Sequence, residues 1–186
     1  MTSPASIASP SLAALHAAAA AAGLTVRSSA SWPETDADGE VPALAGFIES
    51  SFSPLLAEVA ARALRRRAQP SGAGHVTAIV MVTALGDVTS AVRVAAAVDA
   101  GKRVSPLLFF QSVPNAVAGY LAVRWHLTGP VVCVSGTRAG MDVAALLIED
   151  ADADESLVVR VDLAGPDGGE DHAAAILVTR PAASDP

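Results

Sequence analysis

Residues 75–83, HVTAIVMVT, form a nearly continuous run of apolar and β-branched side chains. Such a run is typical of a strand that is buried on both faces of a sheet, because a strand with one solvated face alternates apolar and polar residues. Gly86 and Asp87 end the run, and residues 88–100 have the pattern of a helix that stops before Gly101. A buried strand followed by a helix is the repeating unit of layered α/β proteins.

The same alternation continues through the rest of the chain. Further helices are predicted at residues 12–22, 53–67, 114–127 and 138–150, and further strands at residues 24–28, 131–135, 157–163 and 173–179. Loops, turns or connections are predicted at residues 31–42, 69–74, 104–110, 150–155 and 166–171, and frayed ends at residues 1–10 and 180–186. The predicted fold class is α/β, a single domain over residues 1–186 with a mostly parallel sheet and helices on both faces.

The composition is that of a globular domain with a thin core. Of the 186 residues, 52% are hydrophobic and 17% are charged, which is the opposite of the balance found in disordered chains. The chain has 41 alanines but only seven aromatic residues, so the average apolar side chain is small. Such a core is shallow unless its elements pack very closely or a partner chain completes it.

Charge and cysteine content exclude several classes of protein. The formal net charge is −7, and phosphate backbones repel an acidic chain, so no nucleic-acid partner is expected. Cys133 is the only cysteine, which excludes an internal disulfide and a zinc site built on several thiolates. No basic segment precedes the alanine-rich residues 12–24, and no apolar run approaches the length of a membrane span. We therefore expect a cytoplasmic protein with no membrane partner.

No cofactor or metal site is predicted. The glycines match neither the Rossmann fingerprint nor a P-loop, and Asp87 is interpreted as the cap of the helix at 88–100. The four histidines are not at metal-ligand spacing, and the acidic residues 149–155 lack the glycine and the terminal spacing of a calcium loop. The three arginines 65–67 suit the dipole at a helix end better than they suit a phosphate site.

Two hydroxyl residues are candidates for a nucleophile. Ser135 and Thr137 lie in the turn between the strand at 131–135 and the helix at 138–150, although the pattern G-x-S-x-G is absent. Cys133 lies inside the apolar strand, where a thiolate would be destabilised, and is interpreted as a small buried hydrophobe. One hypothesis is therefore a self-standing acyltransferase or hydrolase that uses Ser135 or Thr137.

Several segments resemble the N-terminal half of β-ketoacyl synthases. Residues 105–120, SPLLFFQSVPNAVAGY, are similar to the segment that precedes the nucleophile strand in that family. The Gly-Pro pair at 129–130 and the strand at 131–135 resemble the part that leads to the active-site cysteine. Residues 141–149, 157–162 and 171–178 resemble the helix and the two strands that follow. The similarity covers residues 45–180 and implies a thiolase-like half-fold.

The departures from the family imply a different role. At the nucleophile position the chain has Thr137 or Arg138, and Cys133 lies four or five residues too early. The family's catalytic histidines belong to a second half, for which this chain has no positions. The resemblance therefore implies a truncated, non-catalytic homologue of the chain-length-factor type. Such a subunit pairs with an active ketosynthase in type II polyketide systems that make polyenes, and meets the acyl carrier protein through the complex.

The resemblance also implies which residues shape the site. The residues expected to line the partner's acyl tunnel are Phe109, Phe110, Ser112, Val113, Ala116, Val117 and Tyr120. The residues expected at the heterodimer interface are Asn115, Val131, Val132, Cys133, Val134 and Ser135. Four of the tunnel residues, at positions 113, 116, 117 and 120, form one stripe if the segment is helical. The alternative is that both phenylalanines belong to an ordinary core.

Overall fold

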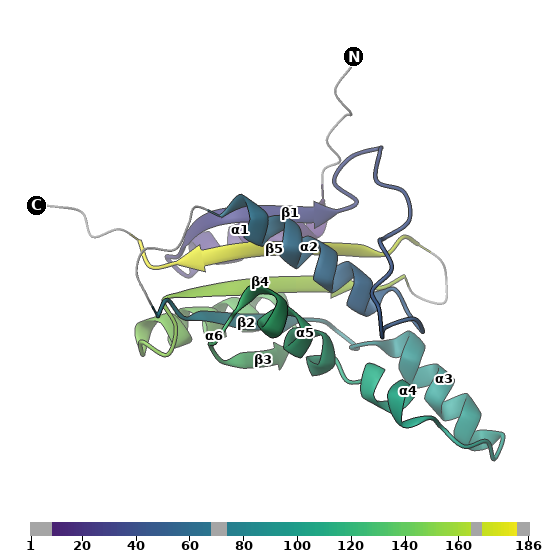
Figure 1. Ribbon diagram of the computed structural model, residues 1–186. Coiled ribbons are helices and arrows are strands. Elements are labelled where there is room, and N and C mark those ends of the chain that lie inside the picture. Colours follow the sequence, from purple (N-terminus) through teal and green to yellow (C-terminus); the bar gives the residue numbers. More distant parts are fainter. Residues whose placement is uncertain (1–8, 68–73, 165–168, 182–186) are drawn as a thin grey trace, which may run out of the picture.

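The computed structural model describes residues 9–67, 74–164 and 169–181, and strand β2 (Thr77–Val82) lies inside its five-stranded sheet. All six residues of β2 are buried, as the apolar run predicts. β2 pairs in parallel with β3 (Val131–Val134) on one side and with β4 (Glu155–Asp162) on the other. β4 pairs antiparallel with β5 (His172–Thr179), which pairs antiparallel with β1 (Thr25–Trp32). The strand order is β1-β5-β4-β2-β3 (Figure 1).

The α/β class is confirmed, but the sheet is mixed rather than mostly parallel. The two pairings made by β5 are antiparallel. The short segment 163–171 between β4 and β5 cannot hold the crossover of about a dozen residues that a parallel pairing needs, so the chain turns back on itself. β1 is also longer than predicted: Ser31 and Trp32, assigned to a surface loop, are buried strand residues.

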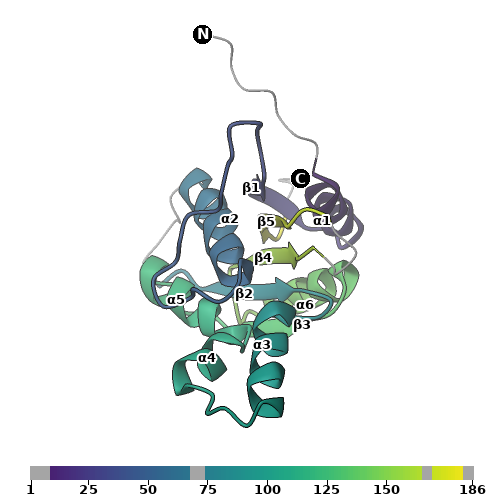
Figure 2. The same cartoon turned by 90° about the vertical axis from the view of Figure 1, so that its right-hand side faces the viewer.

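Helices cover both faces of the sheet, as Figure 2 shows. α1 (Pro10–Ala21) and α6 (Thr137–Glu149) pack on the face that carries Val80 and Val82. α2 (Phe52–Arg66) and α5 (Asn115–Trp125) pack on the opposite face, which carries the alternate β2 residues 79 and 81. Neighbouring strand residues point to opposite faces, so β2 needs apolar side chains at every position.

Two glycines let these layers approach closely. A Cβ at Gly140 would overlap the side chain of Val82, so the residue at this position must be glycine for α6 to lie this near to β2. A Cβ at Gly129 would lie 2.6 Å from the carbonyl oxygen of Thr77, which Gly129 N–H contacts directly. Close approach of the backbone is how a core with few large side chains is filled.

Helices α3 (Val88–Asp99) and α4 (Pro106–Gln111) form an arm that extends beyond the sheet (Figures 1 and 2). The start of α3 confirms the predicted cap: the Asp87 carboxylate accepts hydrogen bonds from the backbone N–H and the hydroxyl of Ser90, at 3.0 and 2.7 Å. α4 replaces the predicted connection at 104–110. Its first turn is capped by Ser105, whose hydroxyl accepts from the backbone N–H of Leu108 at 3.1 Å.

Strand β3 is an edge strand, which corrects the prediction of a buried strand at 131–135. Within the described part of the chain it pairs with β2 alone, and its outer side carries no neighbour. Cys133 is consequently exposed rather than a buried hydrophobe. The apolar sequence of β3 thus resembles that of an interior strand, although the chain itself does not enclose it.

The other predicted helices and strands are confirmed with shifts of a few residues at their ends. The predicted turns at 69–74 and 166–171 and the predicted frayed ends lie mainly outside the described residues. No helix in the described ranges is both long enough and apolar enough to cross a membrane.

Candidate functional site

The arm, α5 and the edge strand carry most of the large apolar side chains that are exposed in the described part of the chain. Of the twelve large apolar residues that are exposed in the described part of the chain, ten fall between residues 85 and 131. These ten, which we call the apolar belt, are Leu85, Val92, Val98, Leu107, Phe109, Phe110, Val113, Tyr120, Val123 and Val131. A large exposed apolar area marks an interaction site in a protein that is otherwise normally folded.

Helix α3 supplies Val92 and Val98 to the belt, and almost its whole surface is exposed or half-buried. Its sequence, VTSAVRVAAAVD, has one positive and one negative side chain, and Ser90 is its only buried residue. An isolated surface helix normally directs apolar residues to a core and charged residues to water. α3 has a largely apolar surface, and among the described residues no core packs behind it.

Residues 46–49 fix the arm against the body. The side-chain amide of Gln111 donates a hydrogen bond to the carbonyl oxygen of Gly46, and Arg93 forms an ion pair with Glu49. The rings of Phe110 and Phe47 lie 6.4 Å apart between centroids, in a tilted arrangement. The exposed face of the arm is therefore held in one orientation by contacts on its other side.

Most of the predicted tunnel residues lie in or beside the belt. Phe109 and Phe110 on α4 are 64% and 54% exposed, and Val113 follows them between the two helices. Ser112 and Ala116 are half-buried. Val113 and Tyr120 are exposed, but less so than the two phenylalanines. Val117 is fully buried in the core, together with Ala118 and Leu121. The predicted stripe thus spans the boundary between the core and the surface.

Five of the six predicted interface residues lie on the edge strand β3 or directly after it, and Asn115 begins α5. Asn115 and Ser135 are exposed, and the four residues of β3 are exposed or half-buried in alternation. The outer edge of β3 has backbone N–H and C=O groups with no partner strand among the described residues. Another strand could therefore pair there and extend the sheet.

Thr137 lies at the start of α6, in a pocket of about 160 Å³ at the carboxyl ends of β2, β3 and β4. Nη1 of Arg160 donates a hydrogen bond to its hydroxyl oxygen at 2.9 Å, and Nε of the same arginine donates to Asp162 at 2.7 Å. Ser11 also donates to Asp162, at 2.8 Å. The Arg138 side chain is almost fully exposed beside Asp142, so Thr137 is the residue that faces this pocket.

The free thiol offers little nucleophilic character. Partial burial raises the pKa of Cys133, so the thiol form dominates near neutral pH. Cys133 also lies on the strand and is absent from the lining of the Thr137 pocket.

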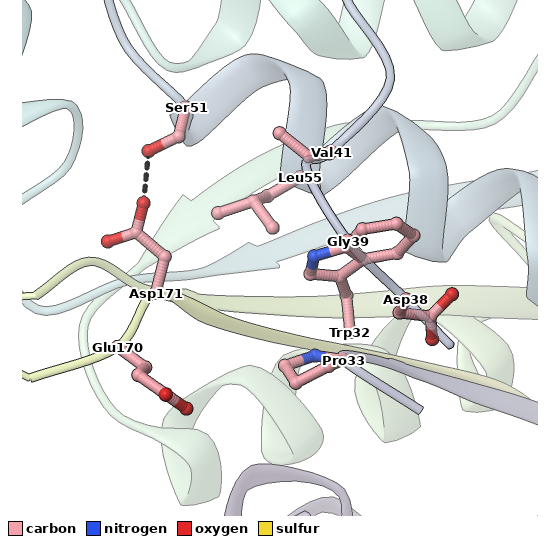
Figure 3. Close-up of a pocket in the computed structure, with 9 residues that line it drawn as sticks. All are labelled: Trp32, Pro33, Asp38, Gly39, Val41, Ser51, Leu55, Glu170 and Asp171. Carbon is pink, nitrogen blue, oxygen red and sulfur yellow. Dashed lines mark hydrogen bonds between the residues drawn. The ribbon is translucent and has the colours of Figure 1, made fainter. Parts of the chain in front are cut away.

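A second pocket, of about 290 Å³, contains none of the predicted site residues (Figure 3). Two of its three carboxylates already have partners: Asp171 accepts a hydrogen bond from Ser51, and Asp38 accepts from Arg62 at 2.8 Å. The Arg62 guanidinium also lies 4.4 Å from the centre of the Trp32 ring and holds the pKa of Asp38 well below its usual range. The contacts of Arg62 with Trp32 and Asp38 fix the loop after β1. No sequence motif predicts them, because Arg62 is far from the other two residues in the chain.

The arginines at 65–67 serve mainly as structural ion-pair partners. Arg66 contacts both carboxylate oxygens of Glu34 at 2.6 Å, and Arg67 contacts Glu155 at 2.9 Å. Neither side chain is therefore free to hold a phosphate. Arg65 is exposed and lines a third pocket, between α2 and α5.

Residues 25–182 match the family model of the β-ketoacyl synthase N-terminal domain. No curated protein sequence matches the chain significantly. One similar solved structure is a ketosynthase in complex with its chain length factor from Xenorhabdus doucetiae, with 20% identity and a TM-score of 0.63 over 78% of this chain and 65% of that one. Another is the ishigamide ketosynthase/chain length factor, with 17% identity and a TM-score of 0.62 over 81% of this chain and 50% of that one. The chain thus spans two thirds or less of these relatives, and the similarity confirms the thiolase-like ketosynthase fold.

Proposed function

The chain belongs to the β-ketoacyl synthase family, and from this premise we propose that it is a non-catalytic subunit of the chain-length-factor type. In this proposal it pairs with a ketosynthase in type II polyketide biosynthesis and closes the far end of the tunnel that holds the growing acyl or polyene chain. The acyl carrier protein meets the subunit only through the complex. No cofactor takes part in this role.

The apolar belt is the observation that carries the proposal. An apolar surface over the arm, α5 and the edge strand fits an obligate partner better than it fits water, since burial of apolar area is the main favourable term in association. We infer that the partner is a ketosynthase, because both similar solved structures named above contain a ketosynthase with a chain length factor. The interface should bury more than about 2,000 Å² in total, as obligate pairs do.

The surroundings of Thr137 support a non-catalytic role. A nucleophilic hydroxyl needs a base that removes its proton, and a histidine usually serves. The residues that line the Thr137 pocket include no histidine, and the hydroxyl oxygen accepts a hydrogen bond from Arg160. Ser135 is exposed outside this pocket. The alternative of a self-standing acyltransferase or hydrolase therefore gains no support from either residue.

Co-purification tests the proposal. The tagged full chain is expressed alone and together with a ketosynthase of its own genome, and each preparation is examined by sedimentation velocity. We expect the chain alone to self-associate through the belt, and the chain with the ketosynthase to form a stable 1:1 heterodimer. A chain that stays monomeric without a partner would show that the belt needs no ketosynthase.

Mass spectrometry tests the non-catalytic role separately. The chain is incubated with an acyl thioester and digested, and we expect no acyl group on any side chain. Covalent loading of Thr137, Ser135 or Cys133 would overturn this part of the proposal.

A further inference from the structure

Helices α2 and α5 and residues 42–44 enclose a pocket of about 230 Å³ on the face of the sheet that these helices cover. Its lining includes Ala57, Ala61 and Arg65 from α2 and Tyr120, Arg124 and Trp125 from α5. On α2, the small residues Ala57 and Ala61 leave the space open, and Arg65 stands one turn beyond Ala61. On α5, Tyr120 and Arg124 are four residues apart and share a helix face.

The two arginines of this pocket differ from most others in the chain. Arginines 62, 66, 67, 93, 138 and 160 each have a carboxylate within 4.0 Å. No described carboxylate lies within that distance of Arg65 or Arg124. Glu58, the one acidic residue of the lining, is held by Nε of Arg62 at 2.8 Å. The pocket therefore keeps two uncompensated guanidinium groups in a chain whose overall charge is −7.

The walls of the pocket are suited to an apolar group. The lining includes proline, alanine and leucine side chains from residues 42–44 and α2, and the rings of Tyr120 and Trp125 on α5. The Arg124 guanidinium lies 5.7 Å from the centre of the Trp125 ring. A guanidinium binds carboxylate or phosphate oxygens with two parallel hydrogen bonds, and an apolar body packed on the walls would add burial.

We propose that this pocket binds an organic anion, with Arg65 and Arg124 holding its carboxylate or phosphate and the apolar and aromatic walls holding its body. The site shares Tyr120 with the apolar belt, but its two arginines belong neither to the belt nor to the expected tunnel.

Calorimetric titration of the full chain tests the site, with the chain purified alone or together with a co-expressed ketosynthase. The probes are phenyl phosphate, inorganic phosphate and benzyl alcohol. We expect phenyl phosphate to bind with a Kd below about 1 mM, and each of the other two probes to bind at least about tenfold more weakly. The double variant R65Q/R124Q should lose at least about tenfold in affinity for phenyl phosphate. The matched control R27Q/R103Q removes two other arginines that form no ion pair with a described carboxylate and should bind like the parent.

Ala61→Leu gives a second test that leaves both arginines in place. The larger side chain fills the pocket, so phenyl phosphate should bind at least about tenfold more weakly than to the parent. Equal binding by the parent and R65Q/R124Q would overturn the proposal, as would unchanged binding in Ala61→Leu or the absence of saturable heat. Equal affinity for inorganic phosphate and phenyl phosphate would mean an adventitious ion only. Each of these results is separate from heterodimer formation, so it leaves the proposed subunit role untouched.

Discussion

At Thr137 a single side chain determines what chemistry the start of α6 can carry. A thiol at this position would meet the Arg160 guanidinium and the N-terminus of a helix, and both lower the pKa of a cysteine. The native Cys133 is in the opposite situation, because partial burial raises its pKa.

We therefore predict that Thr137→Cys, made in a Cys133→Ser background, reacts with iodoacetamide at pH 7 at least about tenfold faster than Cys133 does in the parent chain. Mass spectrometry of timed samples measures both rates. A further Arg160→Leu change should slow the reaction of the new thiol. Equal rates at the two positions would mean that the Thr137 pocket does not stabilise an anion.

Asp38 makes the stability of the chain depend on pH. Its carboxylate accepts two hydrogen bonds from Arg62 and two from the backbone N–H groups of Glu34 and Thr35. These contacts lower the pKa of Asp38 below its ordinary value of 3.8. The folded state thus binds fewer protons than the unfolded state, so the contribution is present above about pH 5 and is lost as the pH falls through 3.8 and below.

We predict that Asp38→Asn lowers the free energy of unfolding at pH 7 by about 1.5–3 kcal/mol, the range for hydrogen bonds to charged groups. The loss should shrink as the pH falls below 3.8, because Asp38 in the unfolded parent chain is then protonated and the contribution of its folded-state contacts declines. Urea unfolding of both chains between pH 7 and pH 2 measures this difference. Asp36→Asn is the matched control, since Asp36 is an exposed residue of the same loop and should change stability by less than about 0.5 kcal/mol.

At the scale of helices and strands, local patterns predicted most elements but not their neighbours. The apolar run of β2 and the Asp87 cap of α3 depend on adjacent residues, so both could be predicted from the sequence. The edge position of β3 and the antiparallel pairings of β5 depend on which strands meet in space, and no local pattern encodes that. The sequence does not predict α4, because the six residues Pro106–Gln111 are too few to show a helical period.

In the candidate site, too, some features follow from the sequence and others depend on how the elements pack. The sequence placed Phe109, Phe110 and Val113 in one functional segment, and the structure exposes all three. It could not predict that Val117 is buried, because the rotation of α5 about its axis is set by packing against the core. The cluster around Arg62 was not predicted at all.

The segment from α4 to α5 carries the next prediction. In the proposed pair, the volume of its exposed side chains sets the depth of the acyl tunnel. Phe110→Ala and Val113→Ala should lengthen the product, and Ala116→Trp should shorten it. The product distribution of the reconstituted pair measures each effect. Leu146→Ala, which changes an exposed residue on α6 outside the apolar belt, should leave the distribution unchanged. If the first three variants also leave it unchanged while the heterodimer stays intact, these side chains only pack.

At the scale of the whole molecule, the chain divides into a well-packed body and an exposed apolar side. The body combines large buried side chains such as Phe52 and Leu15 with close backbone approach at Gly129 and Gly140. The arm and the edge strand contribute little to that core, since each has few or no buried residues. Substitutions on the arm should therefore affect association much more than they affect folding.

The last prediction concerns exposed residues of the arm, which should matter for association but not for folding. Val92 and Val98 on α3 are each 60% exposed, and Leu146 on α6 is 54% exposed but lies outside the apolar belt. A glutamate on any of them stays solvated in the isolated chain, so its cost to folding should be below about 0.5 kcal/mol. Buried against a partner without an opposite charge, the same glutamate costs several kcal/mol. V92E/V98E should thus weaken the ketosynthase complex by at least about a hundredfold, whereas L146E should leave it intact.

Surface plasmon resonance with the immobilised ketosynthase measures the affinities, and circular dichroism confirms the helical content of each variant. A complex that is equally tight for V92E/V98E and for L146E would place the interface away from α3. If L146E alone weakened the complex, the partner would have to cover the α6 face instead. The comparison works because the three residues are nearly equal in exposure and apolar character, so the face on which each lies is the main difference between them.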